Sequence, residues 1–193
     1  MSNTLRFHHV TKRFGAQVVL SDFSLDLPVG QVSCLMGPSG SGKTTLLNLL
    51  MGLIVPDSGS VQTIHPQSVV FQEDRLLPAL TGLGNLRLIT GGGQDAGLLR
   101  LLGELGLAGE GHKPVRDFSG GMRRRVAIAR ALAADYELLL LDEPFKGLDA
   151  DTRARTAEVI RRYSHGKTVV LVTHDPHEAE LMEAHIVQLP AIL

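Results

Sequence analysis

The chain has 193 residues, which is the size of one domain with a substantial core. Hydrophobic residues make up 44% of it and charged residues 20%, and its formal net charge is −1. These values exclude a disordered or fibrous protein and provide no basic field of the kind that attracts nucleic acid. The single cysteine, Cys34, cannot form an internal disulfide, which fits a reducing cytoplasm, and we expect it to be a small core residue.

The order of the apolar runs predicts an α/β fold. Near the N-terminus the pattern predicts antiparallel strands over residues 5–10 and 18–27, around a turn at Phe14 and Gly15. Short apolar runs then alternate with longer helical patterns, which is typical of a mostly parallel sheet covered by helices. We expect buried strands over residues 32–36, 138–141 and 168–172, and helices over residues 44–51, 119–134, 151–163 and 176–184.

The middle of the chain is dense in leucine and interrupted by glycine. We interpret approximately residues 73–130 as a small helical lobe inserted into a single domain that covers residues 1–193. No window contains the roughly 18 consecutive apolar residues that a membrane-spanning helix needs. A role at a membrane would therefore require docking to another protein.

Residues 37–44 fit the phosphate-loop pattern G-x-x-x-x-G-K-[ST], with an apolar strand before them and a helix after them. The glycines let backbone N–H groups wrap a phosphate, and the helix N-terminus adds further donors and a positive dipole end. Lys43 would contact the β- and γ-phosphates, and the hydroxyl of Thr44 would ligate Mg²⁺. The nucleotide-binding residues expected in this segment are Gly37, Pro38, Ser39, Gly40, Ser41, Gly42, Lys43, Thr44 and Thr45.

The apolar run at residues 138–141 delivers two carboxylates, Asp142 and Glu143, to the C-terminal edge of the sheet. In phosphate-loop enzymes such an aspartate holds Mg²⁺ directly or through water. We expect Glu143 to orient the attacking water or to remove its proton. The alternative, a polar turn after a strand, is the minor one because the phosphate loop is present.

A second anion-binding helix end is predicted after Phe118. Ser119 is a good N-cap, and Gly120 and Gly121 leave the first helical turn bare, so its N–H groups are open to an anion. Residues 118–122 resemble the signature sequence of ATP-binding cassette (ABC) domains, with Met122 where glutamine is most common. The resemblance implies that two such domains pair head to tail, so that the signature helix of one closes over the γ-phosphate held by the other.

The resemblance covers nearly the whole chain and implies further roles. Gln72 resembles the glutamine that contacts Mg²⁺ and the attacking water, and His174 resembles the histidine that contacts the γ-phosphate. Asp149 resembles the aspartate at the dimer seam, and Phe14 the aromatic residue on which adenine stacks, although tyrosine is commoner there. The implied catalytic residues are therefore Glu143, His174 and Gln72, and the implied metal ligands are Thr44, Gln72 and Asp142.

Two other sequence patterns resemble functional motifs, but we assign no metal-binding or nucleic-acid-binding role to them. His174 and His177 lie on opposite sides of a helix start at Asp175 and Pro176, so they do not share a helical face and we reject a metal site there. The basic run at residues 123–125 has no interleaved aromatic residue. We expect it to be a solvated or phosphate-neutralising helix face, and we expect no nucleic-acid partner.

The expected fold class is therefore α/β, a P-loop NTPase (RecA-like) core of mostly parallel sheet with an N-terminal antiparallel β subdomain and an inserted helical subdomain. The resemblance implies an ATPase subunit of a membrane transporter that uses ATP and Mg²⁺ and works as a nucleotide-sandwich dimer of identical or different subunits. It implies transmembrane permease subunits, a substrate-binding protein, and a peripheral position on the cytoplasmic face of the cell membrane.

Residues 71–78 resemble the corresponding region of bacterial importer subunits for nitrate, sulfonates, taurine or thiamine-type precursors, a resemblance that says little about the cargo. Two alternatives stand beside this interpretation. A soluble cassette ATPase of DNA repair or translation tends to carry a long coiled-coil insertion or two cassettes in one chain, and neither is present. A non-cassette nucleotide enzyme, such as a small kinase, would leave residues 118–122 without a role.

Overall fold

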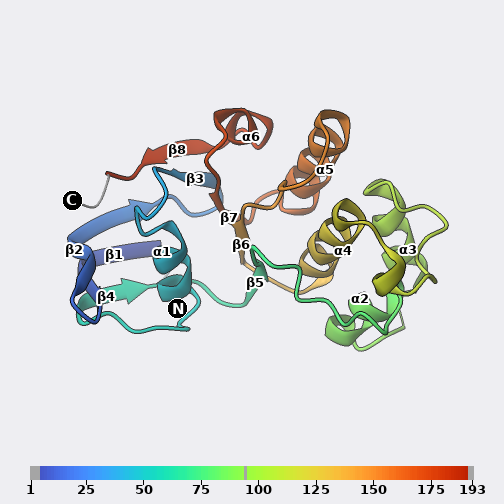
Figure 1. The fold of residues 1–193 in the computed structure, drawn as a ribbon, viewed down its shortest axis with the longest axis horizontal. Coiled ribbons are helices and arrows are strands. Elements are labelled where there is room, and N and C mark those ends of the chain that lie inside the picture. The colour runs from blue at the N-terminus through green and yellow to red at the C-terminus, as the bar shows by residue number, and fades with distance from the viewer. Residues whose placement is uncertain (1–4, 94, 191–193) are drawn as a thin grey trace.

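The computed structural model describes residues 5–93 and 95–190, which form two sheets and six α-helices (Figure 1). Three antiparallel strands make the first sheet, in the order β2 (Gln17–Leu27), β1 (Leu5–Phe14), β4 (Ser58–Gln62). Five parallel strands make the second, in the order β5 (Gln67–Val70), β6 (Leu138–Asp142), β7 (Thr168–Val172), β3 (Val32–Met36), β8 (His185–Gln188).

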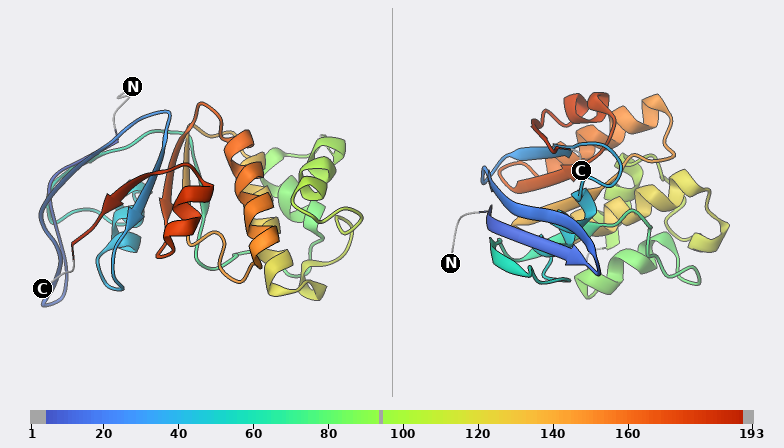
Figure 2. Two further views of the ribbon diagram at one scale, coloured as in Figure 1. Left: turned by 90° about the horizontal axis from the view of Figure 1, so that it is seen from above. Right: turned by 60° about the vertical axis from the view of Figure 1, so that its left-hand side comes forward.

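The parallel sheet separates two cores, because successive side chains of a strand point to opposite faces. Leu138 and Leu140 of β6 pack in a core shared with α1 (Lys43–Leu50) and the antiparallel sheet. Leu139 and Leu141 pack in the other core, against α4 (Gly120–Ala133), α5 (Ala150–Tyr163) and α6 (Pro176–Leu181). Helix α1 therefore lies between the two sheets, as the view from above in Figure 2 shows.

The end of the molecule away from the antiparallel sheet is helical (Figure 1). Helices α2 (Gly82–Thr90) and α3 (Asp95–Glu104) pack on α4, and an Arg87–Asp95 ion pair joins them to each other. A short 3₁₀ turn (Val115–Asp117) leads into α4. The bounds of the inserted lobe, residues 73–130, stay a prediction. Within the described residues no helix is long and apolar enough to cross a membrane.

The predicted fold class is confirmed, and the predicted strands and helices are present with ends that shift by a few residues. Cys34 is fully buried in β3, as expected of a core residue. Three short strands were not predicted: β4, β5 and β8. All three lie at a sheet edge, where burial is incomplete and the apolar pattern is correspondingly weak.

Candidate functional site

The loop between β3 and α1 is shaped to receive an anion. Gly40 and Gly42 have φ angles of 82° and 85°, a left-handed conformation that glycine adopts without cost. At Gly37 a Cβ atom would lie 2.7 Å from Ser41 Oγ, so a side chain there would close the loop. Helix α1 starts at Lys43 without a side-chain cap, which leaves its first N–H groups for a phosphate. The loop therefore fits the phosphates that the sequence predicts for it.

The ammonium group of Lys43 lies over this loop. Its Nζ donates to Gly37 O at 2.7 Å and to Pro38 O at 2.9 Å, and it is 3.5 Å from Ser41 Oγ. All three acceptors belong to the loop between β3 and α1, so the positive charge of Lys43 is held against this loop. Phosphate oxygens placed in the loop would compete for the same donors.

A cavity of about 180 Å³ brings the three predicted metal ligands together. Thr44 comes from α1, Gln72 from the loop after β5, and Asp142 from the end of β6. Their oxygen atoms are the ligand type that Mg²⁺ prefers, and Mg²⁺ is usually held by one or two carboxylates together with substrate phosphates. Among the described residues no group of three or more His, Cys, Asp or Glu could hold a metal ion.

Asp142 is buried, with 8% of its surface exposed. Burial raises the pKa of its carboxyl group, and the neighbouring charge of Glu143 raises it further, whereas Arg124 and Lys43 oppose the shift. The ionised carboxylate is therefore destabilised in the folded protein even with these two cations nearby, and a divalent ion would stabilise it. That is the expected behaviour of a ligand for a divalent ion.

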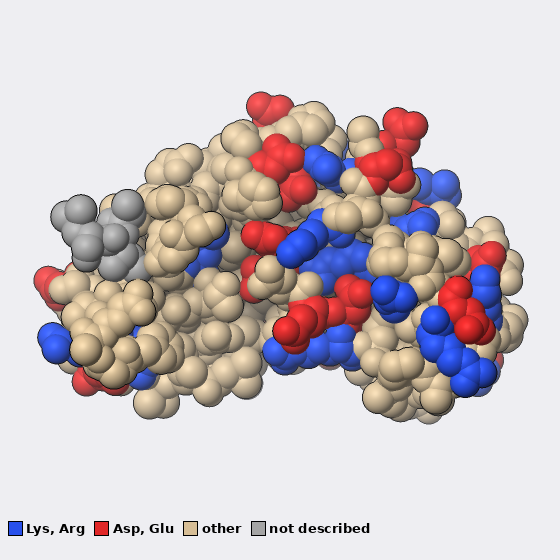
Figure 3. Space-filling view, viewed as in Figure 1, with Lys and Arg blue, Asp and Glu red and all other residues tan. Residues whose placement is uncertain are grey.

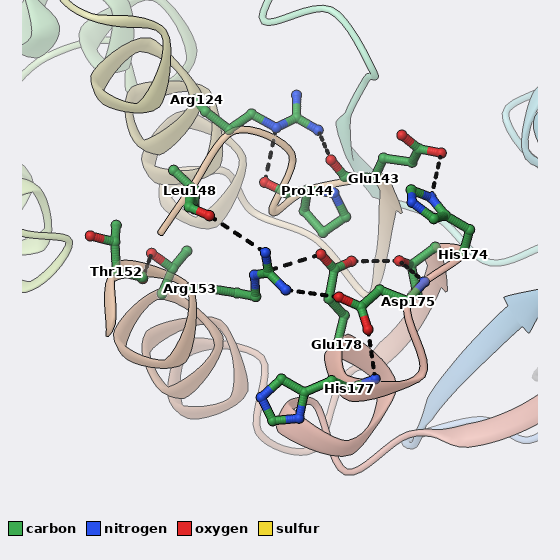
Figure 4. Close-up of polar contacts among 12 residues, drawn as sticks. Arg124, Glu143, Pro144, Leu148, Thr152, Arg153, His174, Asp175, His177 and Glu178 are labelled. Carbon is green, nitrogen blue, oxygen red and sulfur yellow. Dashed lines mark hydrogen bonds and ion pairs between the residues drawn. The ribbon is translucent and has the colours of Figure 1, made fainter. Parts of the chain in front are cut away.

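Glu143 and His174 lie together at the ends of two adjacent strands. Both residues line a second cavity of about 300 Å³, and Glu143 Oε1 is 3.4 Å from His174 Nδ1 (Figure 4). The Glu143 side chain is 23% exposed and that of His174 is 76% exposed, so both can reach a ligand. The φ angle of Glu143 is 45°, which is uncommon for a residue with a side chain.

A polar network that sequence reasoning missed supports the segment that carries His174. Arg153 of α5 donates from Nη1 to Asp175 Oδ2 at 2.8 Å, and its Nη2 is 3.5 Å from Leu148 O (Figure 4). Glu178 is buried and accepts a hydrogen bond from the Thr173 hydroxyl. The network ties the loop before α5 to the turn after β7. No short motif announces it, because its members are distant in sequence.

The signature segment lies at the N-terminus of α4. Ser119 is the N-cap, as predicted, and its hydroxyl accepts from Met122 N at 3.2 Å. Ser119 and Gly120 are exposed, and neither they nor Gly121 line either of the two cavities. The start of α4 therefore contributes to neither of these two cavities.

The two remaining predicted residues also lie outside the cavities. Phe14 ends β1 and is 49% exposed, with Lys12 Nζ 5.5 Å from the centre of its ring. Asp149 is the N-cap of α5, where its carboxylate accepts from Thr152 N at 2.9 Å. That hydrogen bond is the largest cause of the lowered pKa of Asp149.

The expectation for residues 123–125 is wrong. Arg124 is only 3% exposed and donates to backbone carbonyl groups of two loops, and Arg125 donates to Leu105 O at 3.0 Å. Adjacent helical residues point about 100° apart, so three of them cannot share one solvated face. The helical period places Arg124 on the same face as the buried residues Ile128 and Ala131, and that signal was readable in the sequence.

Charged side chains of both signs gather across the middle of the face in Figure 3, over the region where β5, β6 and α4 meet. In this part of the structure Arg124 Nη1 lies 3.4 Å from Asp74 Oδ1, and Arg130 donates to Arg75 O at 2.7 Å. The basic run thus donates hydrogen bonds to the backbone of this chain.

Comparison with known proteins gives one consistent family. A family model described as ABC transporter matches residues 20–146. Aliphatic sulfonates import ATP-binding protein SsuB 3 of Paraburkholderia xenovorans (strain LB400) is 48% identical over 177 residues, which cover 87% of this chain and 69% of that protein. A protein named aliphatic sulfonates import ATP-binding protein SsuB 2, from Streptomyces avermitilis, is 43% identical over 190 residues, covering 96% of this chain and 76% of its own.

Two solved structures share the architecture. A dimeric structure of MJ0796, described as a bacterial ABC transporter cassette, has a TM-score of 0.84 at 31% identity and covers 96% of this chain and 94% of that one. A bacterial Atm1-family ABC exporter with ATP bound has a TM-score of 0.87 at 22% identity and covers 97% of this chain and 37% of that one. At that identity the exporter speaks to the fold alone.

Replacement of Lys43 by Ala should weaken ATP binding on the order of 100-fold, because hydrogen bonds to charged groups contribute ~1.5–3 kcal/mol each. The thermal midpoint should change little, since Lys43 Nζ contacts only atoms of its own loop. Calorimetric titration with ATP measures the effect. Lys167→Ala is the control, because Lys167 pairs with Glu137 on the surface. Unchanged affinity in Lys43→Ala would contradict the phosphate loop.

Asp142→Asn should stabilise the nucleotide-free protein while it impairs Mg²⁺ use. The folded-state pKa of Asp142 is raised, so ionisation costs stability as the pH rises above the unfolded-state pKa. The gain in thermal midpoint should therefore be present at neutral pH and shrink in acid. The Mg²⁺ concentration for half-maximal hydrolysis should rise about 10–100-fold. Asp135→Asn, the same change at an exposed carboxylate, is the control; a destabilised Asp142→Asn would refute the argument.

Proposed function

The chain belongs to the ABC transporter family, and from that premise we propose that it is the ATPase subunit of an importer for small organic anions of the sulfonate class. As a cassette of this family it binds and hydrolyses ATP to power transport. The observation that carries the proposal is the cavity that unites Thr44, Gln72 and Asp142 beside the loop of Lys43. The names of relatives at 41–48% identity point to the cargo.

The residues at this edge divide the work of hydrolysis. Lys43 and the N–H groups of the loop bind the phosphates, and Phe14 offers an exposed ring for the adenine. Thr44, Gln72 and Asp142 would hold Mg²⁺, which would neutralise charge on the phosphate oxygens. These positions orient the substrate before any bond breaks.

Glu143 and His174 act on the attacking water and the terminal phosphate. Glu143 Oε1 accepts the proton that the water loses, and His174 contacts the γ-phosphate from the end of the adjacent strand. The 3.4 Å separation of Glu143 Oε1 and His174 Nδ1 lets each side chain orient the other. Arg153 supports His174 through its bond to Asp175.

The bare helix end at Ser119, Gly120 and Gly121 completes the site of a second subunit. These residues line neither cavity of their own chain, yet they offer N–H donors to an anion. A similar cassette has been solved as a dimer. In the proposed head-to-tail pair, of identical or different subunits, each signature helix contacts the γ-phosphate bound by its partner, and Asp149 lies at the seam.

The proposed assembly works at a membrane. Two transmembrane permease subunits would carry the cargo, a substrate-binding protein would deliver it, and this chain would sit peripherally on the cytoplasmic face of the inner (cell) membrane. The importer names of the relatives support this arrangement. A soluble cassette ATPase without a transporter is the less favoured alternative, and co-purification of the chain with a membrane-spanning subunit distinguishes the two.

Glu143→Gln should bind ATP normally and hydrolyse it about 10²–10⁴-fold more slowly, because an amide keeps the shape of the carboxylate but is a poor base. Release of phosphate at saturating ATP and Mg²⁺ measures the rate. Glu180→Gln is the control, since Glu180 is exposed on α6. Turnover near the wild-type rate would mean that another group accepts the proton.

Ser119→Arg, made in the Glu143→Gln background, should abolish an ATP-dependent dimer. Slow hydrolysis in Glu143→Gln lets ATP accumulate the closed pair, which sizing chromatography detects. An arginine at the exposed N-cap would block the close approach of the helix end to the partner's nucleotide. Affinity of the monomer for ATP should stay within the error of the titration. Ser60→Arg, on the exposed edge strand β4, is the control; a dimer that persists in the Ser119→Arg protein contradicts the shared site.

A further inference from the structure

Arg124 is a buried cation whose hydrogen bonds go to two separate loops. Its side chain is 3% exposed, and burial lowers its pKa while the charge of Asp74 opposes that shift. Nε donates to Pro144 O at 2.9 Å, and Nη2 donates to Glu143 O at 2.7 Å (Figure 4). Nη2 also donates to Asp142 O at 2.7 Å. Such a complete use of the guanidinium fork is specific to arginine.

The other terminal nitrogen, Nη1, serves the loop that follows β5. It donates to Phe71 O at 2.5 Å and lies 3.4 Å from both Gln72 O and Asp74 Oδ1. The loop after β5 carries Gln72, and the loop after β6 carries Asp142 and Glu143. The Arg124 side chain therefore contacts the backbone of Gln72, Asp142 and Glu143, three of the residues proposed to act on the metal or the water.

The position of Arg124 marks the point where strand pairing stops. The register of β5 and β6 ends with Val70 opposite Leu141. The next residues, Phe71 and Asp142, would be the following pair, and their carbonyl groups both accept from Arg124 instead. Where the two chains separate to form the cavity, the guanidinium group thus replaces the ladder and sets the distance between them.

Arg124 also holds the unusual backbone of Glu143. A left-handed φ of 45° at a residue with a side chain is unfavourable and persists only where neighbouring groups fix it. Glu143 N donates to Val172 O at 2.9 Å on one side, and Glu143 O accepts from Arg124 on the other. These two bonds hold the peptide groups on both sides of the Glu143 Cα atom, which carries the carboxylate side chain.

We propose that Arg124 is a positioning residue for hydrolysis, which fixes the separation of Gln72 from the two carboxylates and the backbone conformation of Glu143 without touching the nucleotide. The inference rests on the proposed roles of Gln72 and Glu143. Because Arg124 lies in α4, whose N-terminus carries Ser119, the same helix joins the end offered to the partner subunit to the loops that hold the reacting groups.

Arg124→Gln tests the proposal by separating kcat from KM. The variant should lose kcat on the order of 100-fold, the size of effect that a misplacement of about 1 Å produces. KM for ATP should stay close to wild type, because the phosphate loop makes no bond to Arg124. Arg124→Lys keeps the positive charge but loses the forked guanidinium group, so its kcat should lie between that of wild type and that of Arg124→Gln. An unchanged kcat in Arg124→Gln overturns the proposal.

Arg130→Gln is the matched control. Arg130 comes from the same helix and holds the same loop, through Asp74 O at 3.2 Å and Arg75 O at 2.7 Å, but it does not contact the loop after β6. It should keep kcat close to wild type. An equal loss of kcat in Arg130→Gln and Arg124→Gln would mean that any bond between α4 and the first loop suffices, and would overturn the bridging role.

A double-mutant cycle with Glu143→Gln supplies a readout that general destabilisation does not move. If Arg124 acts through Glu143, most of the loss caused by Arg124→Gln disappears in the Glu143→Gln background, because residues that act as a unit are non-additive. Independent effects would instead repeat in both backgrounds within about twofold, which overturns the proposal. Circular dichroism checks folding, and if neither Arg124 variant folds the residue is a structural cation and the proposal fails.

The outcomes keep this inference distinct from the proposed function. Wild-type turnover in Glu143→Gln alone would refute the proposed proton acceptor, whatever Arg124 does. Slow turnover in Glu143→Gln together with an additive cycle would leave the proposed function intact and remove Arg124 from it. In both cases kcat and KM of the Arg124 variants are each compared with the values of the wild-type protein.

Discussion

Compensation of buried charge at the carboxyl edge of the parallel sheet is the constraint on which the rest of this structure depends. Asp142 and Arg124 are each nearly inaccessible to water, and an uncompensated charge in such a place is strongly unfavourable. The arginine is accommodated by backbone carbonyl groups of two loops. The aspartate has the cations of Arg124 and Lys43 near it. The charged groups of Asp142 and Arg124 thus lie at the edge of a sheet that is covered by an apolar core on each face.

Much of the fold was accessible from the sequence, because its strongest elements are long or fully buried. The run at residues 138–141 has no polar interruption, and the helices around Ser119 and Asp149 have clear capping residues. Strands β4, β5 and β8 were not predicted, because strands of only four or five residues carry little periodicity. Their place is set by pairing with strands elsewhere in the chain.

The candidate site divides in the same way. Short motifs located Lys43, Asp142 and Glu143 because their chemistry requires fixed spacing around a strand end. The contacts of Arg124 and Arg153 could not be predicted from the sequence. Arg124 donates to backbone carbonyl groups 18 or more residues away, and Arg153 donates to the Asp175 carboxylate 22 residues away. Neither kind of contact has a sequence signature. The helical position of Arg124, on the same face as Ile128 and Ala131, could have predicted its burial. It was overlooked because the three adjacent arginines were interpreted together as one basic run.

The self-contact of Lys43 has a consequence for the energetics of nucleotide capture. The ammonium group donates to acceptors of its own loop, at 2.7 Å and 2.9 Å. Arrival of a triphosphate is therefore an exchange of partners for this side chain, and only the difference between the two sets of bonds appears as heat. The entropy of ordering the loop has been spent during folding, so it does not oppose association. Affinity at this edge should accordingly depend strongly on ionic strength, which weakens the phosphate contacts but leaves the internal ones in place.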